Sequence, residues 1–217
     1  MSESTSAAPQ PSQSVPSRRR VASSLAWAVP TVVAAAAAPA EAASPLPRID
    51  RSFLVTRGTQ AAVPGASVSE CRSGSRLSVT TDDVNNYYRI ANVRTGSTVT
   101  NVTASILVQK SMVDAMETGK NPTTFTWTSS TPSWSTPTRE VSGTTPAVYT
   151  YNGIQYYRYV SKLSTPVPAP VSGTITLPII GWYSNCSTTL AGVSVNGRGS
   201  AVVNGETLVQ IGGFRTL

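Results

Sequence analysis

The chain has 217 residues, of which 40% are hydrophobic and 12% are charged, and its formal net charge is +7 at pH 7. It contains no histidine and only two cysteines. This excludes His-based acid–base and nucleophilic catalysis, His-ligated metal sites and a four-thiolate zinc site. The hydrophobic content is too high for a wholly disordered chain. We therefore expect a globular protein without catalysis and without a cofactor.

The N-terminal segment has the three-part organisation of an export signal. A polar stretch comes first, then a basic cluster, and then a weakly apolar, alanine-rich run from residue 21 to residue 40. The basic cluster consists of Arg18, Arg19 and Arg20. Ala40 and Ala42 supply the small side chains that signal peptidase requires just before its cleavage point.

These features divide the chain in two at the expected cleavage point. Residues 1–42 are the predicted signal peptide with a disordered N-terminal extension, and residues 43–217 are the predicted secreted domain. After residue 40 no apolar stretch approaches the roughly 18 residues that a membrane-spanning helix needs, so we expect no membrane contact after cleavage. The alternative is an uncleaved N-terminal anchor, which Pro30 and the many alanines would hold weakly in lipid.

The sequence Ser17-Arg18-Arg19-Arg20-Val21 resembles the twin-arginine export motif, in which Ser-Arg-Arg, a free position and an apolar residue precede a mild hydrophobic stretch. That family prefers Phe at the position of Val21, so the general secretory route stays open as the alternative. The block of residues 18–44 is also similar to the leaders of uncharacterised secreted proteins of high-GC Gram-positive bacteria. The resemblance is limited to this leader and implies a secreted or cell-wall-associated location.

After the leader, the sequence predicts an all-β protein. Ser and Thr supply 48 of the 175 residues that follow position 42, and Val, Tyr and Thr dominate the apolar segments, as is typical of strands. Many short strands separated by turn signals, without helical crossovers, favour an antiparallel β-sandwich, immunoglobulin-like or related, with little helix. The predicted strands lie near residues 52–56, 66–70, 76–80, 87–94, 98–108, 123–128, 147–151, 154–162, 171–177, 190–195, 198–203 and 206–211.

An acidic turn follows the predicted strand at residues 76–80. Asp82 and Asp83 are the only adjacent carboxylates of the chain, and with Asn85 they are candidates for binding Ca²⁺ through oxygen ligands. The segment lacks the glycine and the final glutamate of a recognised calcium loop. The alternative is an ordinary solvated turn, and no other metal site is expected.

One short helix is predicted from Ser111 to Thr118, with Ser111 as its N-cap and Gly119 as its terminator. Beyond it, the Ser-, Thr- and Pro-rich residues 129–146 are predicted to form a long surface loop or a linker. The proline-rich residues 163–170 are predicted to be extended and poor at ladder pairing.

Three Asn-Gly pairs lie between apolar runs, where Asn and Gly readily adopt the positive φ angles of a type I′ hairpin turn. The pairs are Asn152-Gly153, Asn196-Gly197 and Asn204-Gly205. We expect the last two to join three strands into a C-terminal meander.

The hairpin around Asn152-Gly153 carries aromatic side chains on both faces. Strand alternation places Tyr149, Tyr151, Ile154 and Tyr156 on one face and Val148, Thr150, Gln155, Tyr157 and Tyr159 on the other. We take Tyr157 and Tyr159 as a candidate binding face, with Trp134 as a second exposed aromatic, because planar rings suit stacking on sugars or anchoring a protein contact. The alternative is a strand pair that is buried on both sides.

Cys71 and Cys186 both lie in the expected secreted part, so the sequence predicts one disulfide in an oxidising compartment. This disulfide would join an early strand region to a late one, which favours one domain over two independent ones. The alternative is two free thiols.

The charge of the expected secreted part indicates little about a partner. Removing the three arginines and two glutamates of residues 1–42 leaves 14 basic and 8 acidic residues, a balance of +6. The basic residues are scattered singly, so we expect no nucleic-acid partner, but a weak attraction to anionic polymers of the cell envelope.

We therefore predict an exported, non-catalytic binding or structural module, secreted or at the cell surface. Its partner would be a cell-envelope polymer or another surface protein. One alternative is a carbohydrate-binding module that uses exposed aromatic side chains. A second is a secreted hydrolase that uses two carboxylates, for which the candidates are Glu70, Asp114, Glu117 and Glu140.

Overall fold

Antiparallel strand pairing organises the part of the chain that the structure describes, residues 45–167 and 173–217. In this computed structural model, those residues form sixteen strands and one α-helix. Every pairing between neighbouring strands is antiparallel. The compact unit runs from Pro45 to Leu217.

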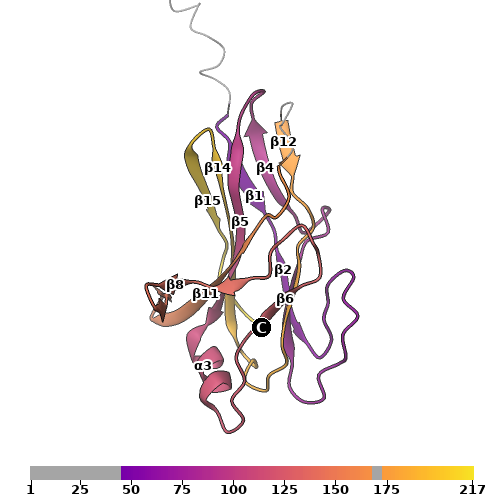
Figure 1. The fold of residues 1–217 in the computed structure, drawn as a ribbon, viewed down its shortest axis with the longest axis vertical. Helices are drawn as coiled ribbons and strands as arrows, with labels where there is room; N and C mark the ends of the chain where they lie inside the picture. Colours follow the sequence, from indigo (N-terminus) through magenta and orange to yellow (C-terminus); the bar gives the residue numbers. More distant parts are fainter. Residues whose placement is uncertain (1–44, 168–172) are drawn as a thin grey trace, which may run out of the picture. The chain divides into compact units, whose positions relative to one another are not determined.

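The largest sheet has seven strands. They are β5 (Val99–Gln109), β7 (Thr138–Arg139), β10 (Val148–Tyr151), β11 (Ile154–Lys162), β14 (Ser194–Val203), β15 (Glu206–Ile211) and β16 (Arg215–Thr216). The order across the sheet is β10-β11-β5-β14-β15, while β7 pairs with β11 and β16 pairs with β14. Figure 1 shows β5, β14 and β15 side by side. Strands that are distant in the sequence therefore lie side by side in its centre.

Two smaller sheets supply the opposing side of the core. One has the order β1-β4-β12, and the other has the order β2-β3-β13-β6. Their strands are β1 (Arg48–Arg51), β2 (Leu54–Gly58), β3 (Arg76–Thr80), β4 (Tyr88–Val93), β6 (Trp127–Ser129), β12 (Gly173–Thr176) and β13 (Gly181–Ser184). A separate two-stranded ribbon consists of β8 (Val141–Ser142) and β9 (Thr145–Pro146).

One hydrophobic cluster joins the three sheets. Alternate residues of β5, from Val102 to Val108, are buried in it, as the two-residue period of a strand requires. Ile90 of β4 and Trp182 of β13 are fully buried in the same cluster. The predicted all-β sandwich with little helix is confirmed.

Two of the three predicted Asn-Gly hairpin turns are confirmed. Asn152 and Gly153 have φ angles of 47° and 76° and connect β10 to β11, and Asn204 and Gly205 have φ angles of 51° and 84° and connect β14 to β15. The pairings Val148 with Tyr157 and Tyr151 with Ile154 give the hairpin the predicted register.

The third predicted turn, at Asn196-Gly197, is wrong, and so is the predicted C-terminal meander. Both residues lie inside β14, a single strand of ten residues, and they pair with Leu107 and Ile106 of β5. The ring of Phe53 lies against Gly197, where an added Cβ would be 2.8 Å from Phe53 Cδ2. This glycine provides space for an aromatic ring instead of a turn.

Helix α3 (Lys110–Thr118) follows β5 directly and packs against β11 and β5 (Figure 1). It matches the predicted helix, and Gly119 is its C-cap as predicted, but the N-cap is Gln109 and no side-chain cap hydrogen bond forms. The predicted strand at residues 66–70 is irregular instead. Within the described residues, no helix is long and apolar enough to span a membrane.

Candidate binding surface

The residues predicted to form the export signal lie outside the described part of the chain. They are Arg18, Arg19, Arg20, Ala40 and Ala42. The expected cleavage between residues 42 and 43 therefore stays a prediction.

Cys71 and Cys186 form a disulfide, as predicted, with their Cα atoms 5.7 Å apart. Cys71 precedes β3 and Cys186 follows β13, and these two strands are paired neighbours in the four-stranded sheet. The disulfide therefore joins the ends of adjacent strands that are more than a hundred residues apart in the sequence.

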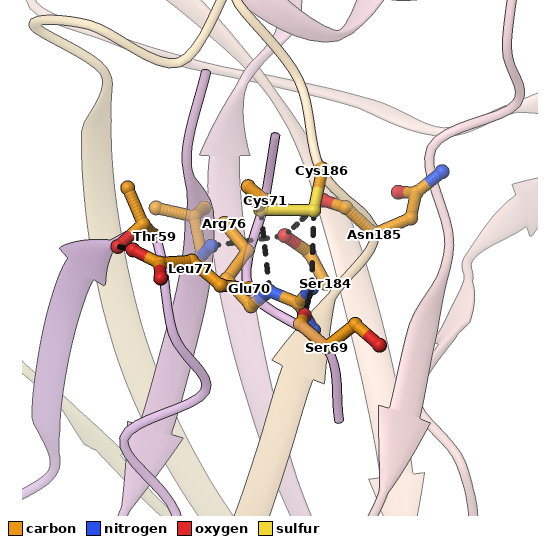
Figure 2. The surroundings of a disulfide bond; sticks show 9 residues. All are labelled: Thr59, Ser69, Glu70, Cys71, Arg76, Leu77, Ser184, Asn185 and Cys186. Atoms are coloured by element: carbon orange, nitrogen blue, oxygen red, sulfur yellow. Dashed lines mark hydrogen bonds between the residues drawn. A yellow bond between two sulfur atoms is a disulfide. The ribbon is translucent and has the colours of Figure 1, made fainter. Parts of the chain in front are cut away.

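The buried guanidinium of Arg76 lies against this disulfide (Figure 2). Its Nη2 donates to Cys186 Sγ at 3.0 Å and to the carbonyl of Ser69 at 2.8 Å, and its Nε donates to Cys71 Sγ at 3.4 Å. The same guanidinium lies 5.6 Å from the ring centre of Tyr183. The sulfur atoms, one carbonyl and one aromatic ring thus surround this positive charge.

The structure contradicts the expected exposure of the predicted binding face. Tyr157, Tyr159 and Trp134 are only 7%, 1% and 2% exposed. Sequence alternation correctly placed Tyr157 and Tyr159 on one face of the hairpin, but that face is turned to the core. These three side chains cannot present their rings to a ligand in this arrangement.

Helix α3 and strand β7 cover the two tyrosines. The hydroxyl of Tyr157 donates to Asp114 Oδ1 at 2.9 Å, and Arg139 Nε donates to the hydroxyl of Tyr159 at 3.1 Å. The Arg139 guanidinium also lies 4.5 Å from the ring centre of Tyr157. Burial raises the pKa of Tyr159, so its phenol stays neutral in the folded protein.

Trp134 is buried because the segment predicted as a loop or linker folds back onto the core. Its indole Nε1 donates to the carbonyl of Pro178 at 3.0 Å, and its ring stacks on Tyr88 with centres 5.8 Å apart. Trp134 also forms an isolated β-bridge with Leu163. Residues 129–146 are therefore anchored in the domain and do not form a linker.

The opposite face of the same hairpin is buried at Tyr156, which is 1% exposed, but it is open near the turn. Tyr151 and Ile154 are 50% and 39% exposed, and on the far strand of the sheet Val209 and Ile211 are 58% and 56% exposed. Tyr151 stacks on Phe214, with ring centres 4.3 Å apart, which fixes the ring while half of the side chain stays in solvent. Sequence reasoning missed this face because both faces of the hairpin carry tyrosines.

Two arginines lie between these apolar side chains on the same face. Arg198 pairs with Ile211 of β15 on one side and with Ser105 of β5 on the other, so these side chains share a face. Arg158 Nε donates to Ser105 Oγ at 3.2 Å on that face. We call this set the open face: Tyr151, Ile154, Arg158, Arg198, Val209 and Ile211. It combines exposed apolar side chains with two positive charges.

The two arginines of the open face have only one nearby carboxylate among the described residues. Glu140 Oε2 lies 3.6 Å from Arg158 Nη1, whereas Arg198 forms no salt bridge with any described carboxylate. Arg198 Nε donates instead to Asn196 Oδ1 at 3.2 Å. Burial, and then repulsion from Arg158, lower the pKa of Arg198. An anionic ligand would relieve this repulsion.

The four carboxylates considered for a hydrolase all have partners within the protein. Glu70 accepts from Thr59 Oγ1 at 2.5 Å, and Glu140 accepts from the hydroxyl of Tyr149 at 2.5 Å. Asp114 bonds to Lys110 and Tyr157, and Glu117 bonds to Arg139. These groups hold side chains and elements in place.

The acidic turn holds its own backbone. Asp82 Oδ1 accepts from the amides of Val84, Asn85 and Asn86 at 2.8 to 2.9 Å, and its Oδ2 accepts from the Asn86 side chain at 2.9 Å. These bonds, foremost those from Asn86, hold the pKa of Asp82 well below its usual range. Asp83 has a φ of 64° within this turn. The Asp82 oxygens thus act as a turn cap, which favours the solvated turn over the calcium site.

Comparisons with known proteins do not place the chain in a family. No family model and no curated protein matches it. A solved structure that concerns "pH-induced modulation of Streptococcus parasanguinis adhesion by Fap1 fimbriae" aligns with 13% identity over 75% of this chain and 88% of that chain, with a TM-score of 0.19. A likeness at this score establishes neither a shared fold nor a shared function.

Proposed function

We propose that this chain is an exported, non-catalytic β-sandwich that binds a polymer of the cell envelope through its open face. The observation that carries the proposal is the composition of that face. Exposed rings stack on sugars, and arginines pair with carboxylate or phosphate groups. A sheet surface that offers both suits an extended polysaccharide with acidic substituents.

Export rests on the leader and on the disulfide. The leader resembles those of secreted proteins of high-GC Gram-positive bacteria, with its twin-arginine-like Ser17-Arg18-Arg19. Disulfides persist in oxidising compartments, so the bond between Cys71 and Cys186 supports a location outside the cytoplasm. The balance of +6 in residues 43–217 favours attraction to anionic envelope polymers.

The absence of catalysis is part of the proposal and rests on chemistry. The sequence has no histidine, so acid–base work would fall to carboxylates. Glu70, Asp114, Glu117 and Glu140 are each engaged by a neighbouring side chain. A paired carboxylate is poorly suited to exchange protons with a substrate.

The test is a pull-down of the full chain, with its disulfide formed, on cell walls and insoluble polysaccharides. We expect the wild type to be retained and the double variant Tyr151→Ala, Ile154→Ser to bind about tenfold more weakly, because the variant would lose the contact area of two exposed apolar side chains. Tyr87→Ala is the matched control, since Tyr87 lies beside β4, outside the seven-stranded sheet.

Thermal unfolding of each variant shows whether it is folded. Retention of the double variant equal to that of the wild type would remove the open face from the proposal. Failure of the wild type to bind any of the polymers would refute the proposed partner and favour a protein partner instead.

A further inference from the structure

A pocket of about 260 Å³ lies on the opposite side of the seven-stranded sheet from the open face. Gly197 and Gln210 line it, and in their strands they alternate with Arg198 and Ile211 of the open face. Arg51, the last residue of β1, and Phe53, from the connection to β2, form another wall. The two surfaces are therefore separate sites.

The guanidinium of Arg51 is held in a fixed position in this pocket. Its Nε donates to the carbonyl of Gln210 at 3.3 Å, and its Cζ lies 5.1 Å from the ring centre of Phe53. The backbone of Gly212 lies so close that an added Cβ would be 1.7 Å from Arg51 Nη2. Glycine at position 212 is what allows the guanidinium to occupy this place.

The charge of the pocket has no counterpart within the described residues. Arg51 forms no salt bridge with a described carboxylate, and no acidic side chain lines the pocket. Arg215 adds a second positive charge to the lining. Burial lowers the pKa of Arg51 to about 10, and repulsion from Arg198 acts in the same direction. A half-buried guanidinium with one carbonyl partner keeps donors available to a ligand.

We propose that this pocket binds one oxyanion group, a carboxylate or a phosphate, with Arg51 as its hydrogen-bond donor and Arg215 as a supporting charge. A guanidinium matches the paired oxygens of both groups. The volume lies below the roughly 300–1,000 Å³ of sites that bury drug-sized ligands, so a single small anionic group fits. This inference goes beyond the proposed function and does not require a polymer on the open face.

The experiment is a titration of the full chain, disulfide formed, with inorganic phosphate and separately with acetate. Ionic strength is held constant with sodium chloride, and the Arg51 Nε–H and the Gly212 and Gly213 amides are followed by NMR. We expect saturable shifts of these signals with phosphate, acetate or both, and the comparison identifies the preferred group. Arg51→Gln should weaken binding about tenfold or more.

Arg72→Gln is the matched control, because Arg72 is an exposed arginine that lines a different pocket. It should bind the anion as the wild type does. If Arg51→Gln does not fold, Arg51→Lys, which keeps the charge and loses the planar fork, and Arg215→Gln should each weaken binding. Shifts that never saturate, or equal affinity in all these variants, would overturn the site.

Discussion

Arg139 and Glu117 form a two-pronged ion pair that joins strand β7 to helix α3. Arg139 Nη1 donates to Glu117 Oε2 at 3.0 Å, and Nη2 donates to Oε1. The amide of Phe125 also donates to Oε1, at 3.0 Å. One carboxylate thus fixes the guanidinium that covers Tyr157 and Tyr159.

Glu117→Gln should lower the free energy of unfolding by about 2 kcal/mol, because it removes charge-assisted hydrogen bonds from a pair whose side chains are only 19% and 21% exposed. Urea unfolding measures the loss. Lys110→Gln is the control, since the Lys110–Asp114 pair is more exposed and should contribute less than about 1 kcal/mol. Equal losses in both variants would contradict this account.

Replacing both Cys71 and Cys186 with serine should lower the free energy of unfolding by about 4–5 kcal/mol, since the disulfide closes a very long loop and restricts the unfolded chain. The variant also removes the two sulfur acceptors of the buried Arg76. Urea unfolding of the variant and of the oxidised and reduced wild type would measure this loss. A loss below about 1 kcal/mol would show that the disulfide is dispensable.

Gly199→Ala should destabilise the protein by about 1–3 kcal/mol, because an added Cβ would lie 2.8 Å from the ring of the fully buried Tyr88. That ring cannot move away easily, since its hydroxyl lies 2.7 Å from the carbonyl of Thr103 and donates there. Gly213→Ala, where a Cβ meets nothing within 4 Å, should leave the unfolding midpoint unchanged. A tolerated alanine at position 199 would mean that the ring can shift.

The turn capped by Asp82 should make the stability of the folded protein depend on pH in the acid range. The pKa of this carboxyl is lower in the folded state than in an unfolded chain, so its contribution is complete at neutral pH and is lost as the pH falls below about 3.9. The difference in unfolding midpoint between wild type and Asp82→Ala should therefore shrink in that range. Asp50→Ala, at an exposed ion pair with Arg48, serves as the control. A difference that does not change with pH would reject the cap.

The double substitution Arg18→Lys, Arg19→Lys should stop export if the leader uses the twin-arginine route. Lysine keeps the positive charge that the general secretory route needs, so the two routes respond differently. Immunodetection of the protein in culture medium and cell wall, compared with the wild type, measures the effect. Undiminished export would assign the leader to the general secretory route.

Local signals in the sequence predicted the strands that have turn residues at their ends. The observed β3, β11 and β15 have the predicted bounds. For β11 and β15, the turns at Asn152-Gly153 and Asn204-Gly205 fix where the strand begins. Asn196-Gly197 carries the same local signal, yet it lies inside β14. There the packing of Phe53, which is distant in the sequence, outweighs the turn preference.

The binding surface could not be predicted for a related reason. Alternation in the hairpin gives two aromatic faces but does not say which one meets the core. That choice depends on Arg139 and on helix α3, which contact Tyr157 and Tyr159. The pocket at Arg51 likewise depends on Gly212, more than 150 residues away along the chain. Only the three-dimensional packing identifies such sites.

The disulfide also determines how the domain responds to mechanical tension. If the chain is pulled at one point before Cys71 and at another after Cys186, the force passes through the sulfur–sulfur bond and bypasses the residues between the two cysteines. The separation of 115 positions corresponds to roughly 390 Å of extended chain that stays unreleased while the bond is intact. A protein tethered to a cell wall under flow would therefore stretch far less in its oxidised form than after reduction.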